Sequence, residues 1–433
     1  MFSLRRANVV RGLVLTAVLI VGLAPAAVAA DDPPGASTFH NIGTVTQPAI
    51  AAIAAGKTAG NPTGLFASFD ISWVDNAHDV YYLADRSNNA VDQVDASDGS
   101  FVQFLGQGKF AGVVVGAPTN RSGPDGVVTD RDGNVWVGDG FSPVNGDTTS
   151  HLKGFNPDTG AMFADVDLGG TGRADELAFG AVGGGRILIA NPDELTSAFV
   201  SLVDTSNQSI IGQQIKYDAM PNTTGVPPAH HGFNTNFGGT QHGLEQSVFS
   251  NNHFYLNVPG TVQNPGGEID VFDANQPVIT DVFPLTTCAG TGLAVGPQDD
   301  LIVECADSVR ILDPKNHGHQ EAIFAQFGGA DEIWFNPGDG NAYFPLAANT
   351  TLRPGIATGL GILDVVNNRP VGGVPLNGKN SGITPVSGAQ GVHSVAASSK
   401  SGRIFLPSSD NPDNGAGGII MLHAASSRHK NDL

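Results

Sequence analysis

The amino-acid sequence predicts an all-β protein that folds as a single β-propeller, most simply with seven blades and alternatively with six. Two features of the composition favour this fold: Gly and Pro supply 57 and 27 of the 433 residues, and only 14% of the residues are charged. Such a composition is typical of short strands joined by many turns, not of charged amphipathic helices. The third observation is a strand–turn–strand pattern that the chain repeats seven times.

Residues 1–30 are typical of a secretory signal peptide. A short basic start is followed by the apolar run 12–23 and then by small residues up to Ala30. The apolar run is too short to cross a bilayer comfortably. We therefore expect cleavage near Ala30, a short linker over 31–37, and a mature protein that is secreted or periplasmic.

Each of the seven repeats begins with a polar residue and continues into two short apolar strands joined by a turn rich in Asp, Asn or Gly. One or two further strands follow in most repeats. A sheet of four such strands has two apolar faces, and both become buried when the sheets stack around an axis. The residues that start the repeats are Asp70, Asp125, Asp175, His242, Thr291, Asp331 and His393.

The last repeat contains only three strands, the third of them over 418–424. The segment 38–46 has the pattern of a strand but belongs to no repeat. We expect it to pair with the last blade, because a ring closed in this way leaves no open edge there. The predicted propeller domain is therefore 38–424, followed by a polar tail over 425–433.

Two repeats resemble a known family. The segments 79–102 (DVYYLADRSNNAVDQVDASDGSFV) and 124–140 (PDGVVTDRDGNVWVGDG) are similar to NHL-type propeller repeats. The other repeats resemble them weakly. The resemblance implies a relative of the NHL/YVTN/SMP-30-like propeller group. Because that group contains lactonases, lyases and non-catalytic modules, it implies the fold far more than the function.

The net charge of the chain is −20. A protein this acidic repels phosphate backbones and anionic lipids, which excludes nucleic acid and membrane surfaces as partners. Neutral or cationic ligands and divalent metal ions are compatible with this charge. We expect a small-molecule ligand or a protein to bind the top face, the face on which the inner strands begin.

The chain has two cysteines, Cys288 and Cys305. Cys288 lies just before one inner strand and Cys305 ends the next strand, so an antiparallel pair would bring them close enough for a disulfide. No C-x-x-C-H motif is present, which excludes covalent c-type haem. Glycine-rich runs at 106–111 and 373–379 are not followed by a helix, so no nucleotide site is expected.

The start of each inner strand faces the mouth of the propeller channel, and six of the seven residues there are Asp or His. Carboxylates favour Ca²⁺ or Mg²⁺, and added imidazoles favour Zn²⁺, Mn²⁺, iron or copper, so the pattern predicts a divalent metal site. The expected metal ligands are His242, His393, Asp70 and Asp331. The expected ligand-binding residues are Asp125, Asp175, and His230 and His231 in the long loop 218–241. Glu176 and Glu332 are the candidate catalytic groups, one of them as a general base.

Two classes of function are consistent with this pattern. The first is a metal-assisted hydrolase or lyase that acts on a small neutral or carbonyl-bearing substrate. The second is a non-catalytic propeller that binds a ligand or a protein, in which the aspartates cap backbone N–H groups and tie the blades together. A copper-type oxidoreductase is a distant third alternative, suggested by the 12 His of the chain. Whether the protein is an enzyme stays open at this point.

Overall fold

The computed structural model describes most of the chain, and every described residue belongs to the compact unit Pro34–Leu433. The described residues are 39–44, 66, 68–117, 119–142, 146–194, 197–217, 243–261, 264–325, 327–346, 359–375, 392–411 and 416–424. None of the helices within these ranges is long and apolar enough to cross a membrane. The predicted signal peptide, linker and polar tail lie outside the described residues.

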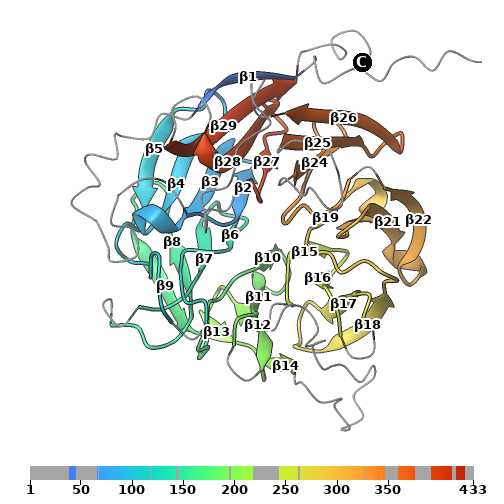
Figure 1. Ribbon diagram of the computed structural model, residues 1–433. Coiled ribbons are helices and arrows are strands. Elements are labelled where there is room, and N and C mark those ends of the chain that lie inside the picture. The colour runs from blue at the N-terminus through green and yellow to red at the C-terminus, as the bar shows by residue number, and fades with distance from the viewer. Residues whose placement is uncertain are drawn as a thin grey trace, which may run out of the picture. The chain divides into compact units, whose positions relative to one another are not determined.

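Seven antiparallel sheets follow one another around a ring, and Figure 1 shows them as blades about a common axis. The first strand of each blade contacts the first strands of both neighbouring blades all the way around. The later strands of each blade follow outward from it. The predicted all-β, seven-bladed propeller is confirmed.

The first three blades occupy the N-terminal part of the ring. Blade one contains β2 (Ser72–Asp75), β3 (Val80–Asp85), β4 (Ala90–Asp95) and β5 (Phe101–Leu105). Blade two contains β6 (Val127–Thr129), β7 (Val135–Asp139), β8 (His151–Phe155) and β9 (Met162–Asp167). Blade three contains β10 (Leu177–Gly180), β11 (Arg186–Asn191), β12 (Ala198–Asp204), β13 (Ser209–Ile210) and β14 (Ile215–Tyr217). Its outer strand is interrupted, because β13 and β14 both pair with β12.

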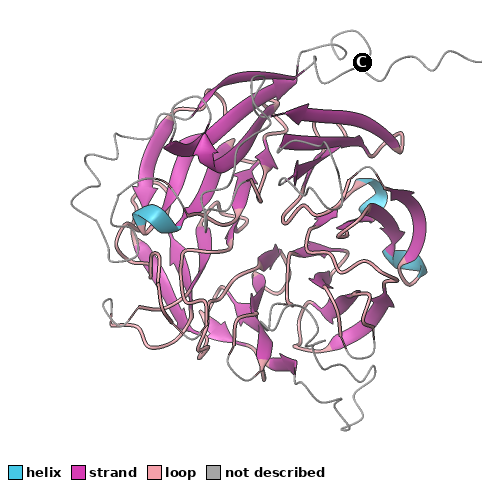
Figure 2. Cartoon of the chain, viewed as in Figure 1, coloured by secondary structure: helices cyan, strands magenta, loops and turns pink. Residues whose placement is uncertain are grey.

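The next three blades each have four strands among the described residues. Blade four contains β15 (Ser247–Ser250), β16 (His253–Val258), β17 (Glu268–Asp273) and β18 (Ile279–Pro284). Blade five contains β19 (Leu293–Val295), β20 (Leu301–Glu304), β21 (Val309–Asp313) and β22 (His319–Phe324). Blade six contains β23 (Trp334–Asn336), β24 (Asn341–Leu346), β25 (Gly359–Asp364) and β26 (Arg369–Pro375). Figure 2 shows that the described helices are short, namely η3 (Arg86–Asn88), η4 (Pro297–Asp299) and η5 (Pro314–Asn316).

Blade seven joins the two ends of the propeller. It contains β27 (Ala396–Ala397), β28 (Arg403–Asn411), β29 (Ala416–Ala424) and, as its outer strand, β1 (Phe39–Thr44). In Figure 1 the blue β1 lies beside the red β29. Phe39 pairs with Ala424 and Thr44 with Ile420 in an antiparallel register. The predicted closure by an N-terminal strand is confirmed.

The core lies between the blades. Leu188 and Leu202 of blade three pack with Phe254 and Phe272 of blade four in one buried cluster. Other clusters fill the junctions between further blades in the same way. Burying each such side chain contributes roughly 1.5–3 kcal/mol. No blade can bury its apolar faces alone, so the stability of each depends on its neighbours.

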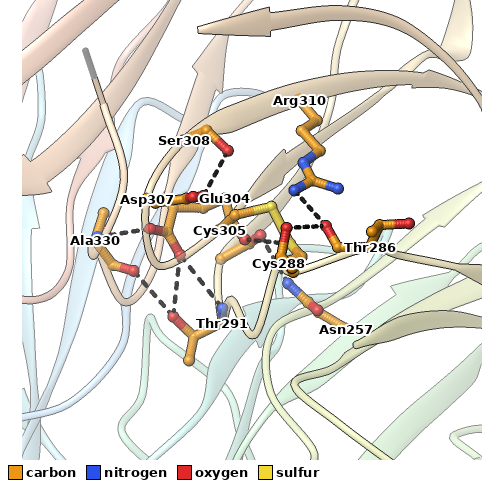
Figure 3. Close-up of a disulfide and its surroundings, with 12 residues drawn as sticks. Asn257, Thr286, Cys288, Thr291, Glu304, Cys305, Asp307, Ser308, Arg310 and Ala330 are labelled. Carbon is orange, nitrogen blue, oxygen red and sulfur yellow. Dashed lines mark hydrogen bonds between the residues drawn. A yellow bond between two sulfur atoms is a disulfide. The ribbon is translucent and has the colours of Figure 1, made fainter. Parts of the chain in front are cut away.

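Figure 3 shows the disulfide between Cys288 and Cys305, whose Cα atoms are 4.5 Å apart. Both residues are fully buried in blade five, so the predicted pairing is confirmed. Beside the disulfide, the Glu304 carboxylate accepts hydrogen bonds from the Ala330 N–H at 2.9 Å and the Thr291 N–H at 3.3 Å. These bonds hold together the segments that lead into blades five and six.

Removing the closing strand tests this architecture. Deleting residues 31–46 removes all five register pairs between β1 and β29. We expect the free energy of unfolding to fall by roughly 1–5 kcal/mol, since each cross-strand pair contributes about 0.2–1 kcal/mol. Urea unfolding followed by circular dichroism measures the change. Deleting only residues 31–37 is the matched control, and equal stability of the two truncated proteins would contradict the closure.

Candidate functional site

The backbone defines one equivalent position at the entrance to each inner strand. In blades one to four the N–H of this residue donates to the end of the second strand, as from Asp70 to Ala84 at 2.9 Å. In blades one, four and six the N–H of the following residue donates to the equivalent residue of the next blade, as from Glu332 to His393 at 2.9 Å. We call these equivalent residues the mouth ring: Asp70, Asp125, Asp175, Glu245, Thr291, Asp331 and His393.

The mouth ring contains six of the seven residues that start the predicted repeats. In blade four the equivalent residue is Glu245, whose N–H donates to Asn257 at 3.0 Å. His242 lies outside the described residues, as do His230 and His231.

Two arginines that sequence analysis missed, the buried Arg86 and the partly buried Arg173, neutralise part of the ring. The Arg86 Nε–H donates to Asp125 Oδ1 at 2.7 Å, and its Nη2 contacts both Asp70 and Asp125. Arg173 lies 3.0 Å from Asp70, 2.5 Å from Asp175 and, through Nε, 2.6 Å from Asp193. The two guanidinium groups therefore join the mouth segments of blades one, two and three.

The arginines set different charge states for the neighbouring carboxyls. Burial opposes ionisation of Asp70, but Arg86 and Arg173 hold its pKa well below the usual range. Burial raises the pKa of Asp125 well above normal, although the same two arginines oppose the shift. Burial likewise raises the pKa of Asp175. Asp70 is thus the fixed anion of this cluster. The Oδ2 of Asp125 is buried and has no hydrogen-bond partner among the described residues.

Glu176 and Glu332, the two predicted catalytic groups, meet across the mouth. The negative charge of Glu332 acts on Glu176 across the mouth. Burial and the neighbouring acids raise the pKa of both groups well above normal. Glu332 Oε2 also accepts a hydrogen bond from Ser394 Oγ at 2.8 Å, and Ser394 Oγ accepts one from the Ser72 N–H at 2.7 Å. This chain links blades six, seven and one.

His393 lies between the aspartates that are paired with arginine and the two glutamates, Glu176 and Glu332. Its Nε2 is 3.3 Å from Asp70 Oδ1, and its ring stacks on Phe69 with centroids 4.6 Å apart. The side chain is buried, and Nδ1 has no hydrogen-bond partner among the described residues. Stacking and burial fix the ring plane, so Nε2 stays directed at Asp70.

Two groups of three residues bring potential ligand atoms within 4.8 Å of one another. One group is Asp70, Asp125 and Asp175, whose carboxylates already contact Arg86 and Arg173. The other is Asp70, Glu332 and His393, which combines two carboxyls with an imidazole. The second group suits a cation better, because only Asp70 among its members is paired with arginine. Asp331 lies beside these groups and belongs to neither.

Side chains from the inner strands extend across the channel beneath the mouth. Gln246 Oε1 of blade four accepts hydrogen bonds from the N–H groups of Leu293 at 2.7 Å and Ile333 at 3.0 Å. Trp73 and Trp334 meet edge to face, with ring centroids 5.3 Å apart. These tryptophans belong to blades one and six, which lie on either side of blade seven.

Negative charge exceeds positive charge in this region. Eight carboxyl groups are joined by ion pairs or act electrostatically on one another, and two guanidinium groups oppose them. The carboxyl groups belong to Asp70, Asp125, Asp175, Asp193, Asp331, Glu176, Glu245 and Glu332. Such an excess must be relieved by protons or by a bound cation.

The chain matches no protein-family model, and no curated protein matches its sequence. Its fold is similar to that of a solved chain from the "Crystal Structure of Mitotic Checkpoint Complex", with a TM-score of 0.54 and 11% sequence identity. The match covers 96% of this chain and all of the other. At this identity the similarity shows the fold alone. The class that fold and site define is a seven-bladed propeller with acidic residues that could bind a metal ion.

Replacing Arg173 tests the charge balance. Arg173→Met removes a cation that four carboxyls share, so we expect a loss of about 3–5 kcal/mol in the free energy of unfolding at pH 7. The loss should shrink at pH 5, where the carboxyls can take up protons. Arg131→Met is the matched control, since Arg131 is exposed and donates to the Ala181 carbonyl. Similar small losses in both variants would show that the network is not required for stability.

Proposed function

We propose that this propeller binds a divalent metal ion through Asp70, Glu332 and His393 and that, with this ion, it acts as a metal-assisted hydrolase or lyase. The observation that carries the proposal is the convergence of these three ligand groups in a buried, negatively charged mouth. Two carboxylates and an imidazole suit Mn²⁺, Zn²⁺ or Fe²⁺. Ser394 and Phe69 support the set, since outer contacts of this kind orient metal ligands.

A bound ion would polarise a carbonyl oxygen or lower the pKa of a water. Glu176 interacts electrostatically with Glu332 of the ligand set, and in the proposal it accepts the proton from the attacking water and returns it to the leaving group. The excess negative charge disfavours anionic substrates, which supports a neutral, carbonyl-bearing substrate. Gln246 and the tryptophan pair beneath the mouth favour a small one.

The same proposal places the protein outside the cytoplasm. The signal-peptide pattern over 1–30 and the Cys288–Cys305 disulfide support secretion or a periplasmic location, because structural disulfides persist in oxidising compartments.

A second candidate is a non-catalytic propeller that binds a small molecule or a protein on its top face. This candidate is favoured by the ion pairs that Asp70, Asp125 and Asp175 form with Arg86 and Arg173. Through these ion pairs, half of the mouth serves to hold the blades together. A copper-type oxidoreductase has less support. Within the described ranges, His393 is the single imidazole of the mouth ring.

Metal binding by the purified mature protein tests the main proposal. We expect isothermal titration with Mn²⁺ and Zn²⁺ to show one site, and His393→Gln or Glu332→Gln to abolish it without a large change in melting temperature. His317→Gln is the matched control, because its side chain is 85% exposed and remote from the mouth. Unchanged binding in both mouth variants would overturn the assignment.

Glu176→Gln separates catalysis from binding. It should keep Mn²⁺ or Zn²⁺ affinity within a few-fold and lose turnover of neutral esters and lactones. Metal binding by the parent protein with no turnover of such substrates would favour the non-catalytic candidate.

A further inference from the structure

The backbone that carries Glu332 is held by hydrogen bonds from three blades. The Glu332 N–H donates to the His393 carbonyl of blade seven at 2.9 Å. The next N–H along the chain donates to Gln246 Oε1 of blade four at 3.0 Å. Blade five contributes through two side chains, Glu304 and Thr291, that bind the residues directly before Glu332.

Glu304 is the centre of the blade-five contacts, as Figure 3 shows. It ends β20, and its side chain is 1% exposed. One carboxylate oxygen accepts from the Ala330 N–H at 2.9 Å and the other from the Thr291 N–H at 3.3 Å. The Thr291 hydroxyl in turn lies 2.9 Å from the Ala330 carbonyl and 3.1 Å from the Asp331 carbonyl, so its proton is shared between them. One carboxylate thus joins the segments that enter blades five and six.

The sequence around Thr291 leaves room for this close approach. Gly290 and Gly292 flank the threonine. A Cβ atom on Gly290 would lie 1.7 Å from the Glu304 carbonyl oxygen, and one on Gly292 would lie 2.8 Å from the Asp331 carbonyl oxygen. A larger side chain at either position would therefore push these segments apart.

The disulfide anchors the backbone of Glu304. Cys305 follows Glu304 in the chain, and its partner Cys288 lies three residues before Thr291. The Cys305 carbonyl also accepts from the Gly329 N–H at 3.0 Å. The position of the Glu304 backbone is therefore fixed by contacts other than those of its own carboxylate.

We propose that Glu304 and Thr291 are positioning residues that fix the backbone of Glu332 and so hold its carboxylate within the proposed ligand set. The ligand atoms of that set lie within 4.8 Å of one another, so a small displacement of this backbone changes how well they surround an ion. The fixing of the backbone is independent of any ion. Its effect on cation affinity rests on the proposed function.

Four variants separate this role from a general effect on stability. Thr291→Val removes the hydroxyl and nearly keeps the shape, whereas Thr291→Ser keeps the hydroxyl. Glu304→Gln keeps one acceptor oxygen but turns an NH₂ group towards a backbone N–H. Glu268→Gln is the matched control, because Glu268 is fully buried in blade four and accepts from Thr261 Oγ1 at 3.3 Å and from the Asn264 side chain, outside the segment before Glu332.

Amide hydrogen exchange tests the fixing of the backbone, followed by NMR in the full mature protein without added metal. We expect the Ala330 and Glu332 N–H groups to exchange roughly tenfold faster in Glu304→Gln and in Thr291→Val, because each variant removes hydrogen bonds from this segment. Thr291→Ser should restore the slow exchange, and Glu268→Gln should leave both groups unchanged. Exchange at the parent rate in both of the first two variants, or equal acceleration in Glu268→Gln, would overturn the proposal.

The consequence for the site is measured with Mn²⁺ at a temperature at which every variant is folded. The Kd for Mn²⁺ should rise about 10–100-fold in Glu304→Gln and Thr291→Val, as it does when outer contacts of metal ligands are lost, and stay near the parent value in Thr291→Ser and Glu268→Gln. A lower melting temperature with an unchanged Kd would show a purely structural role and overturn the positioning of the site. If the two amide groups respond as expected and the parent protein does not bind Mn²⁺, the fixing of the backbone stands and the proposed metal site fails.

Discussion

The balance of buried negative charge at the channel mouth is the constraint on which the rest of this structure depends. A propeller brings the starts of all its inner strands to one end of one axis, so polar residues from separate repeats converge there. A buried carboxylate costs several kcal/mol unless it is paired or protonated. Both solutions occur here: Arg86 and Arg173 pair with the aspartates of blades one to three, and burial raises the pKa of Glu176 and Glu332, which favours their protonated forms.

The site depends on the closure of the ring. Asp70 and His393 are 323 positions apart in the sequence, yet their side chains are 3.3 Å apart. They meet because blade seven packs against blade one, through contacts such as the Ser72 N–H to Ser394 Oγ hydrogen bond. The outer strand β1 completes that blade from the other end of the chain. Opening the ring at this junction would therefore separate Asp70 from Glu332 and His393 as well as expose apolar surface.

The sequence was sufficient for the fold and for most of the mouth ring, because both follow from a repeated local pattern. Seven repeats with two apolar faces leave few architectures, and equivalent positions in the repeats become neighbours around the axis. Arg86 and Arg173 could not be found in this way, since each lies in a connection between strands, outside the repeated strand pattern. The closest signal was Arg173, two residues before Asp175. In blade four the sequence pattern starts the repeat at His242, whereas the equivalent residue in the structure is Glu245, three positions later. The long segment before this strand hides its exact start.

The mouth has two halves, the aspartates paired with arginine and the two glutamates, and they differ in whether a bound cation can replace the positive charge already there. An arginine keeps its charge at any physiological pH, so the carboxylates that contact Arg86 and Arg173 are held by a permanent internal cation. That half behaves as part of the framework. On the other side, burial and the neighbouring acids raise the pKa of Glu176 and Glu332, and a proton bound there can be replaced by another cation without breaking an ion pair. His393 borders this side and shares Asp70 with the framework. A ligand that changes the charge of the mouth is therefore expected to act on the glutamates and His393, while the arginines keep the surrounding blades in place.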